Sequence, residues 1–203
     1  PTSGPIPATL YAADAAKNTF SGSNSIQSAA FEYGVGGDTD HLLYPNYRVF
    51  LVTTKNSVAD AVGTTDSPVF ALQLTGYYGG AGGTASGYPS FRWIDQLSKT
   101  QKTATVNASA GWVYYNRATA SEVAETGTWH IAFNRYNVKL NGGTSGNGTV
   151  GGFVGATPAG FYAADGVTPV AAKFKAATPA DTLADLTGVL KTPATAAGWI
   201  KDA

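Results

Sequence analysis

Three side chains in this sequence could ligate a metal or a haem iron: His41, His130 and Tyr78. Cys and Met are absent and there are only two His, so thiolate sites and Met ligation are excluded. His41 follows Asp40 in a polar, glycine-containing loop that could present it to a ligand. The alternative is an ordinary exposed loop histidine. Asp38, Asp40 and His41 together could form a small metal site, but their spacing lacks the full calcium-loop pattern and its terminal Glu. We expect a solvated acidic turn there.

His130 lies in a strand-like stretch between Trp129 and Ile131, so it should point to the face opposite theirs. It is either a ligand or a polar side chain on the outer face of a sheet. Tyr78 is the third candidate because a phenol can ligate ferric haem. Tyr77 and Tyr78 are adjacent, and neighbouring strand residues point to opposite faces unless the strand bulges. Packing in the core or at an edge is the default for at least one of them.

Nothing in the sequence forms a recognisable catalytic arrangement, and we expect a binding protein rather than an enzyme. No Gly-x-Ser-x-Gly elbow follows a strand, and the glycine turn at 141–148 lacks both a GxGxxG–helix pattern and a Walker lysine. Thirteen Lys and Arg balance thirteen Asp and Glu, which removes the basic surface that nucleic-acid binding requires. No apolar run approaches the length that spans a bilayer.

The elements that must position these residues are mainly strands. Alternating and apolar runs predict strands at 47–54 and 69–75, joined as a hairpin through Asp66-Ser67-Pro68, and another strand at 88–94. Residues 103–106 and 112–115 suggest a second hairpin, and 128–140 forms the densest strand. We expect that strand to share a sheet with the strands around Phe50 and Leu72.

Only the last quarter of the chain predicts a helix. Thr178 is a suitable cap, Pro179 suits the first helical position, and Leu183, Leu186 and Leu190 recur at helical spacing.

The fold class is therefore all-β, an antiparallel sheet or sandwich with one short C-terminal helix. Residues 1–30 read as an N-terminal arm or edge segment and 31–203 as a single β-domain. The low charge, the missing Cys and Met and the start at Pro1 favour a mature extracellular or outer-membrane surface protein whose signal peptide has been removed.

Residues 128–148 carry the one specific motif, TWHIAFNRYNVKLNGGTSGNG. The stretch resembles the signature of the HmuY family, haem-binding β-proteins secreted by or displayed on Gram-negative bacteria. That signature reads Trp-Asp-x-Ala-x-x-Arg-Tyr-Asp-x-Arg-x-Asn, followed by Gly-x-Ser-Gly-x-Gly. The matching positions are Trp129, Ala132, Arg135, Tyr136, Asn141, Gly143, Ser145, Gly146 and Gly148. His130 and Asn137 stand where the family has Asp.

A second segment, 46–79, resembles the strand pair that the family carries late in its chain. Here it precedes the signature half at 103–150, so the motif order is permuted. The resemblance implies an HmuY-like fold, haem as cofactor and an outer-membrane receptor as partner, with His41, His130 and Tyr78 as candidate contacts for haem or another flat ligand. The family's best-studied members ligate haem through paired His or Met outside the signature, and Met is absent here.

The composition leaves a second function open. Low charge, abundant small residues and the polar arm suit a structural subunit of a surface filament or adhesin. Such a homopolymer would assemble by strand exchange between neighbours at an open sheet edge. A polysaccharide-active enzyme is the weakest alternative, since only the aromatic content favours it.

Overall fold

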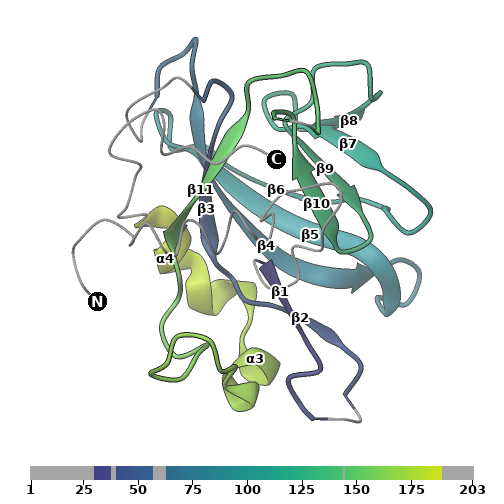
Figure 1. Ribbon diagram of the computed structural model, residues 1–203, viewed down its shortest axis with the longest axis vertical. Helices are drawn as coiled ribbons and strands as arrows, with labels where there is room; N and C mark the ends of the chain where they lie inside the picture. Colours follow the sequence, from purple (N-terminus) through teal and green to yellow (C-terminus); the bar gives the residue numbers. More distant parts are fainter. Residues whose placement is uncertain (1–29, 38–39, 57–62, 144, 189–203) are drawn as a thin grey trace.

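The computed structural model describes residues 30–37, 40–56, 63–143 and 145–188. Two antiparallel sheets form most of this part of the chain, with a short hairpin at one end (Figure 1). The hairpin consists of β1 (Phe31–Tyr33) and β2 (Leu43–Pro45). The five-stranded sheet has the order β11 (Gly151–Ala156), β3 (Val49–Thr53), β4 (Val69–Gly79), β5 (Ala85–Asp95) and β6 (Gln101–Thr105). The four-stranded sheet has the order β10 (Asn137–Leu140), β9 (Ile131–Asn134), β7 (Val113–Asn116) and β8 (Ser121–Val123). The predicted all-β antiparallel fold is confirmed.

The two sheets face each other across an aromatic core. Phe91 of β5 lies 4.9 Å, between ring centroids, from Phe133 of β9 and 5.1 Å from Tyr115 of β7. Trp93 stacks on Phe91 at 5.5 Å and meets Tyr115 edge-on at 5.7 Å. Edge-to-face and offset contacts at these spacings add to the stabilisation from simple burial. This cluster holds the two layers of the sandwich together.

The strand pairings correct three sequence expectations. The β3–β4 hairpin is present, with Phe50 opposite Leu72, but 103–106 and 112–115 do not form a hairpin. β6 pairs with β5, while β7 pairs with β8 and β9 in the other sheet. The stretch 128–140 is not one strand either, because it turns at Arg135 and Tyr136 into the β9–β10 hairpin.

The third correction concerns the sheet to which β9 belongs. We expected the strand containing Ile131 and Phe133 to share a sheet with β3 and β4, and this was wrong. It lies in the opposite sheet, but both residues pack into the same hydrophobic core as Phe50 and Leu72. The three stretches meet face to face rather than edge to edge, which makes the fold a sandwich.

The last part of the C-terminal helical segment packs on the outer face of the five-stranded sheet (Figure 1). It contains α3 (Ala171–Ala176), the 3₁₀ turn η1 (Pro179–Thr182) and α4 (Leu183–Thr187). Leu186 is fully buried against the outer face. The helix predicted to begin after Thr178 is confirmed, starting as a 3₁₀ turn in which the Asp181 carboxylate accepts the Thr178 N–H at 2.7 Å. Leu190 lies outside the described residues, and the α3 helix was not predicted.

Buried polar groups hold this segment to the sheet. The Arg92 guanidinium donates to Gln73 Oε1 at 2.8 Å and to the Pro179 carbonyl oxygen at 2.7 Å. It also donates to Thr182 Oγ1 at 3.2 Å. The sheet and the helical segment are therefore joined by hydrogen bonds as well as by apolar contact.

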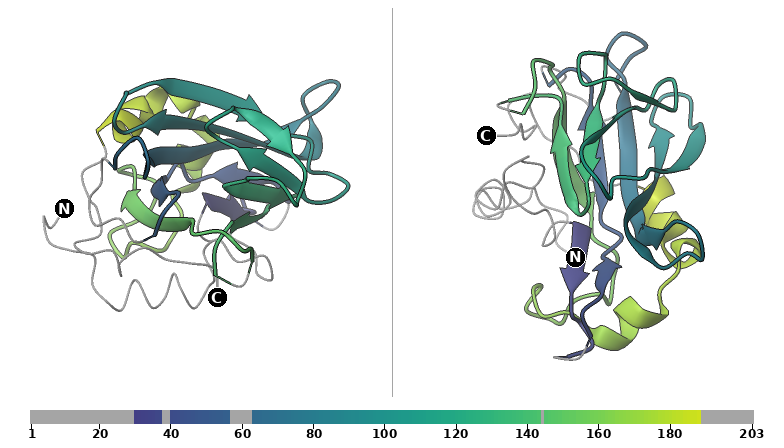
Figure 2. Two further views of the ribbon diagram at one scale, coloured as in Figure 1. Left: turned by 90° about the horizontal axis from the view of Figure 1, so that it is seen from above. Right: turned by 90° about the vertical axis from the view of Figure 1, so that its right-hand side faces the viewer.

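The β1–β2 hairpin and α3 lie together at one end of the sandwich (Figure 2). Within the described residues, no helix has the length and apolar character needed to cross a membrane. The N-terminal arm predicted at 1–30 falls almost entirely outside the described residues. Only Ala30 is described, and it is buried in the main core.

Candidate functional site

A pocket of about 530 Å³ opens where the β1–β2 hairpin, the end of the β4–β5 hairpin and the β9–β10 turn converge. We call it the tyrosine pocket, because hydroxyl-bearing rings from all three hairpins line it. Its lining residues are Tyr33, His41, Leu42, Leu43, Tyr77, Tyr78, Ser86, Arg135 and Tyr136. Two of the three candidate ligands, His41 and Tyr78, lie in this one pocket.

Tyr77 and Tyr78 both line the pocket because β4 is irregular there. The register between β4 and β5 shifts on either side of Gly76, so the strict alternation of side chains is broken. The two rings meet edge-on at 5.1 Å, and the Tyr77 ring lies 6.4 Å from that of Tyr136. Tyr77 is buried while Tyr78 is half-buried. The bulge required for both to serve one pocket is present.

The Tyr78 hydroxyl accepts a hydrogen bond from the Leu43 N–H at 3.0 Å, which fixes the phenol oxygen beside the β1–β2 hairpin. The β1–β2 hairpin and β4 are thereby joined at the pocket wall.

His41 is exposed, and its Nδ1 lies 2.9 Å from the Tyr33 hydroxyl. The two rings are 6.2 Å apart between centroids. A hydrogen bond at one ring nitrogen fixes the orientation of an imidazole, as in metal-binding histidines. If Nδ1 carries the proton and donates it to Tyr33, Nε2 keeps its lone pair for a ligand.

The signature contributes two residues to the pocket through the β9–β10 turn. Arg135 adopts a left-handed conformation, φ 55°, at the two-residue connection between Asn134 and Asn137. Its Nη2 donates to Ser86 Oγ at 3.1 Å, across the pocket on β5. Arg135 is exposed at the pocket, where its guanidinium pairs with a hydroxyl. Tyr136 follows it on the same rim.

His130 is separate from this pocket, and its expected position was wrong. It lies in a bend just before β9 and is only 7% exposed, so it is not a polar side chain on an outer face. Its Nδ1 accepts the Arg117 N–H at 3.2 Å. Burial, reinforced by the positive charge of Arg117, lowers the pKa of His130 to about 3. His130 therefore serves as a neutral acceptor within the fold.

The acidic turn before His41 is tied to other parts of the protein. Asp38 lies outside the described residues, whereas Asp40 forms an ion pair with Lys175 at 3.3 Å and accepts the Tyr44 hydroxyl at 3.0 Å. Burial alone would raise the pKa of Asp40, but the hydrogen bonds from Tyr44 and Leu42 and the charge of Lys175 lower it. No cluster of three or more His, Asp or Glu that could hold a metal occurs in the described part of the chain.

The tyrosine pocket provides the donor types that suit ferric haem. It combines one imidazole, several phenols, a guanidinium that could pair with a propionate and apolar surface from Leu42 and Leu43. Of these groups, Tyr33, Ser86, Arg135 and Tyr136 were not predicted as contacts. Only the Arg135-Tyr136 pair carried a sequence signal, through the signature itself.

Other signature residues support the fold rather than line the pocket. The Asn141 side chain donates to the Trp129 carbonyl oxygen at 3.0 Å and accepts the Gly148 N–H at 3.0 Å. A Cβ on Gly146 would lie 2.2 Å from Asn141 Oδ1, so only glycine fits there. The spacing of Trp129, Asn141 and the glycines is thus explained by one buried hydrogen-bonded turn.

Comparison with known proteins supports the resemblance drawn from this signature. Searches of the curated proteins and of the solved structures give no match. A family model does match, over 108–203, a range that contains β7–β10, the signature turn, β11 and the C-terminal helices. The strand pair at 46–79 lies outside the matched range. Residues 108–203 of this chain are thus similar to the HmuY family, whose model is described as HmuY protein.

Proposed function

We propose that this protein binds ferric haem in the tyrosine pocket, as an extracellular or cell-surface haem-capturing protein. The observation that carries the proposal is that His41 and Tyr78, from separate hairpins, share one pocket with Arg135 and Tyr136 of the family signature. The match to the HmuY family supports haem as the ligand class and the outside of the cell as the location. An outer-membrane receptor would be the partner that takes the haem onward.

Each pocket residue has a role that follows from its contacts. His41, oriented by Tyr33, would offer Nε2 to the iron. Tyr78, whose hydroxyl is held in place by the Leu43 N–H, would offer its phenol oxygen. Arg135 would exchange Ser86 for a haem propionate, because a guanidinium pairs more strongly with a carboxylate than with a hydroxyl. Bound haem supplies the redox-active iron and the visible absorption. The protein supplies ligation and charge pairing.

Titration of haemin into the purified protein, followed through the Soret band, tests the proposal. We expect a shifted band that saturates at one haem per chain. His41→Ala and Tyr78→Phe should each weaken binding by about tenfold or more, equivalent to at least ~1.4 kcal/mol, and change the band position. Arg135→Gln should weaken binding without moving the band, because it does not touch the iron.

His130→Asn is the matched control. It alters the other histidine but keeps an acceptor for the Arg117 N–H, so haem binding should equal that of the wild type. An unshifted Soret band in the wild type, or unchanged binding in both His41→Ala and Tyr78→Phe, would refute this site.

The alternative role, a filament subunit assembling by strand exchange, is tested on the same preparation. Light scattering at high protein concentration distinguishes a homopolymer from a monomer. A strict monomer that binds haem supports the first role, and concentration-dependent growth without haem binding supports the second.

A further inference from the structure

Arg117 is a fully buried cation with no hydrogen-bond partner on its side chain. It follows β7 and is 0% exposed, and its Nε, Nη1 and Nη2 atoms all lack a partner. Its guanidinium carbon lies 4.2 Å from the centre of the Phe70 ring. Such a stacking contact offsets part of the cost of burial, but it satisfies none of the five N–H groups.

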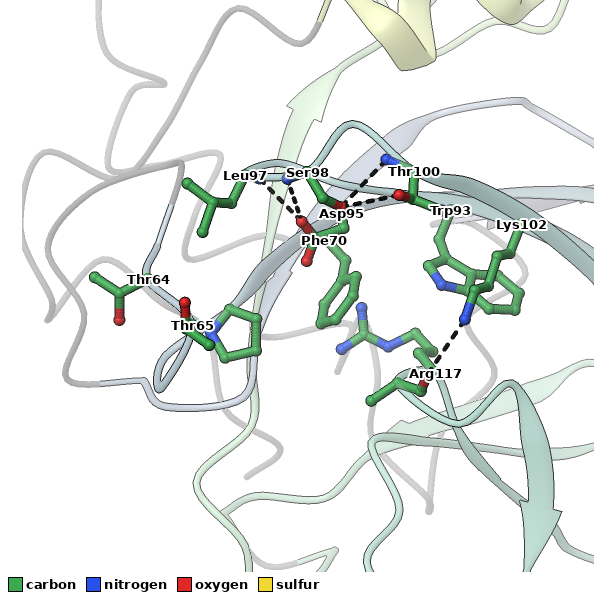
Figure 3. A pocket seen from close by; sticks show the side chains of 12 residues that line it. Thr64, Thr65, Phe70, Trp93, Asp95, Leu97, Ser98, Thr100, Lys102 and Arg117 are labelled. Atoms are coloured by element: carbon green, nitrogen blue, oxygen red, sulfur yellow. Dashed lines mark hydrogen bonds between the residues drawn. The ribbon is translucent and has the colours of Figure 1, made fainter.

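The Arg117 side chain extends between Phe70 and Trp93 toward a second pocket, separate from the tyrosine pocket (Figure 3). This Arg117 pocket has a volume of about 420 Å³. Its walls are the turn before β4, the β5–β6 connection and residues 117–118 after β7. Most side chains around Arg117 there are apolar or hydroxyl-bearing.

The nearest acid does not neutralise Arg117. Asp95 lines the same pocket, but its Oδ1 accepts the N–H groups of Leu97 and Ser98, at 3.1 and 2.7 Å, and so is used in the turn. In the described ranges, the one ion pair joins Lys175 to Asp40, far from this site. Burial lowers the pKa of Arg117 to about 9, so the side chain keeps its charge at neutral pH. An unpaired buried charge is costly unless an acceptor is supplied from elsewhere.

We propose that the Arg117 pocket binds a monocarboxylate with an apolar body, such as an aromatic or branched aliphatic acid. The planar guanidinium fork matches a carboxylate in two parallel hydrogen bonds. Leu97 and Pro68, with the small exposed edge of Phe70, provide the apolar surface that the body of such an acid would cover.

Charge decides between carboxylate and phosphate. Arg117 and Lys102 bring two positive charges to the pocket and Asp95 brings one negative charge. The sum, 2 − 1 = +1, is balanced by a monoanion. A phosphate dianion would leave an excess negative charge beside Asp95 in a largely apolar site.

Calorimetric titration with benzoate, benzamide and inorganic phosphate tests this inference on the full chain. Benzoate should bind, and the melting temperature should rise with the logarithm of its concentration once that exceeds the dissociation constant. Benzamide has the same shape without the charge, and it should bind at least about tenfold more weakly. Phosphate should also bind more weakly than benzoate.

Arg117→Met, which keeps the length and apolar stem, should abolish benzoate binding. Because that variant changes a buried residue, Lys102→Gln at the same pocket is the second variant and should weaken benzoate several-fold while leaving the fold unchanged. Arg135→Gln, at the tyrosine pocket, is the control and should bind benzoate as the wild type does.

Three outcomes would overturn the proposal: no benzoate binding by the wild type, equal binding of benzoate and benzamide, or tighter binding of phosphate. Unchanged benzoate affinity in both Arg117→Met and Lys102→Gln would also overturn it. Haem binding is read out separately at the tyrosine pocket, so either proposal can fail alone.

Discussion

At the scale of single residues, burial separates the two histidines. His41 is exposed beside Tyr33, whereas His130 is enclosed before β9 and accepts the N–H of Arg117. The same neighbourhood therefore contains a histidine kept neutral and an arginine kept charged. The identity of these residues was evident in the sequence, but their burial was not. His130 was expected on an outer face because the alternation of a strand was extended through a bend.

The histidine pKa leads to a prediction about acid stability. His130 has a pKa of about 3 in the folded protein against 6.5 when unperturbed. Between these values the unfolded chain binds a proton that the folded chain refuses, so stability must fall as the pH falls through this window. His130 should lower the free energy of unfolding by up to about 1.4 kcal/mol for each pH unit within this window.

Urea unfolding of wild type and His130→Asn at several pH values from 7 to 3.5 measures this effect. Asn has no titrating group, so the variant should lose less stability on acidification. The difference in unfolding free energy between wild type and variant should therefore shrink or reverse as the pH falls. Parallel pH profiles would show that the His130 pKa is not depressed. His41→Ala, which alters an exposed ring, serves as the comparison.

At the scale of elements, local signals were predictive and long-range pairings were not. The β3–β4 hairpin was predicted because Asp66-Ser67-Pro68 marks its turn, and the helical segment because Thr178 and Pro179 mark its start. The break in 128–140 was missed because it occurs at Arg135, a non-glycine residue with positive φ that no turn motif announces. The pairing of β6 and β7 was wrong because the chain passes from one sheet to the other between them. β6 pairs back with β5, whereas β7 pairs with the later strands β8 and β9.

The hydrogen bonds of Arg92, which join the C-terminal helical segment to the five-stranded sheet, lead to a prediction about stability. Arg92→Leu removes the donors to Gln73 and to the Pro179 carbonyl and leaves these acceptors buried without them. We expect a loss of about 2 to 4 kcal/mol in unfolding free energy and faster amide exchange in α4.

Hydrogen-exchange mass spectrometry and urea unfolding measure the two effects. Arg92→Lys keeps the charge without the planar fork and should fall between the wild type and Arg92→Leu. Thr103→Ala, on the exposed face of neighbouring β6, should change neither quantity. Unaltered α4 exchange in Arg92→Leu would mean that apolar contact through Leu186 alone holds the segment.

At the scale of the whole molecule, one core joins both sheets. Residues from β3, β4, β5, β7, β9 and β10 contribute to the same buried cluster between the sheets, while a smaller cluster lies on the outer face of the five-stranded sheet. The sequence predicted that the strands carrying Phe50, Leu72 and Phe133 lie together. It placed them in one sheet, because alternation identifies a buried face without identifying which layer the face belongs to.

Phe91 is the centre of that shared core, with aromatic neighbours in both sheets. Phe91→Ala should cost about 3 to 5 kcal/mol. Because the core is common to both layers, far-ultraviolet circular dichroism and tryptophan fluorescence should report a single coincident transition in urea, for the variant as for the wild type. Separate transitions would indicate that the sheets unfold independently. Phe91→Leu should lose less unfolding free energy than Phe91→Ala.

The stretch after β11 has a bearing on ligand capture although none of its residues lines the tyrosine pocket. Lys175 is paired with Asp40, and the Tyr162 hydroxyl donates to Glu32 at 2.7 Å and accepts from Asn46 at 3.1 Å. These contacts hold β1, the loop that carries His41 and the residue directly after β2. Preorganising a ligand-bearing loop lowers the entropy lost on association. Loss of the Lys175 and Tyr162 contacts would therefore weaken the proposed haem binding mainly through a faster off-rate, although every side chain that contacts haem would still be present.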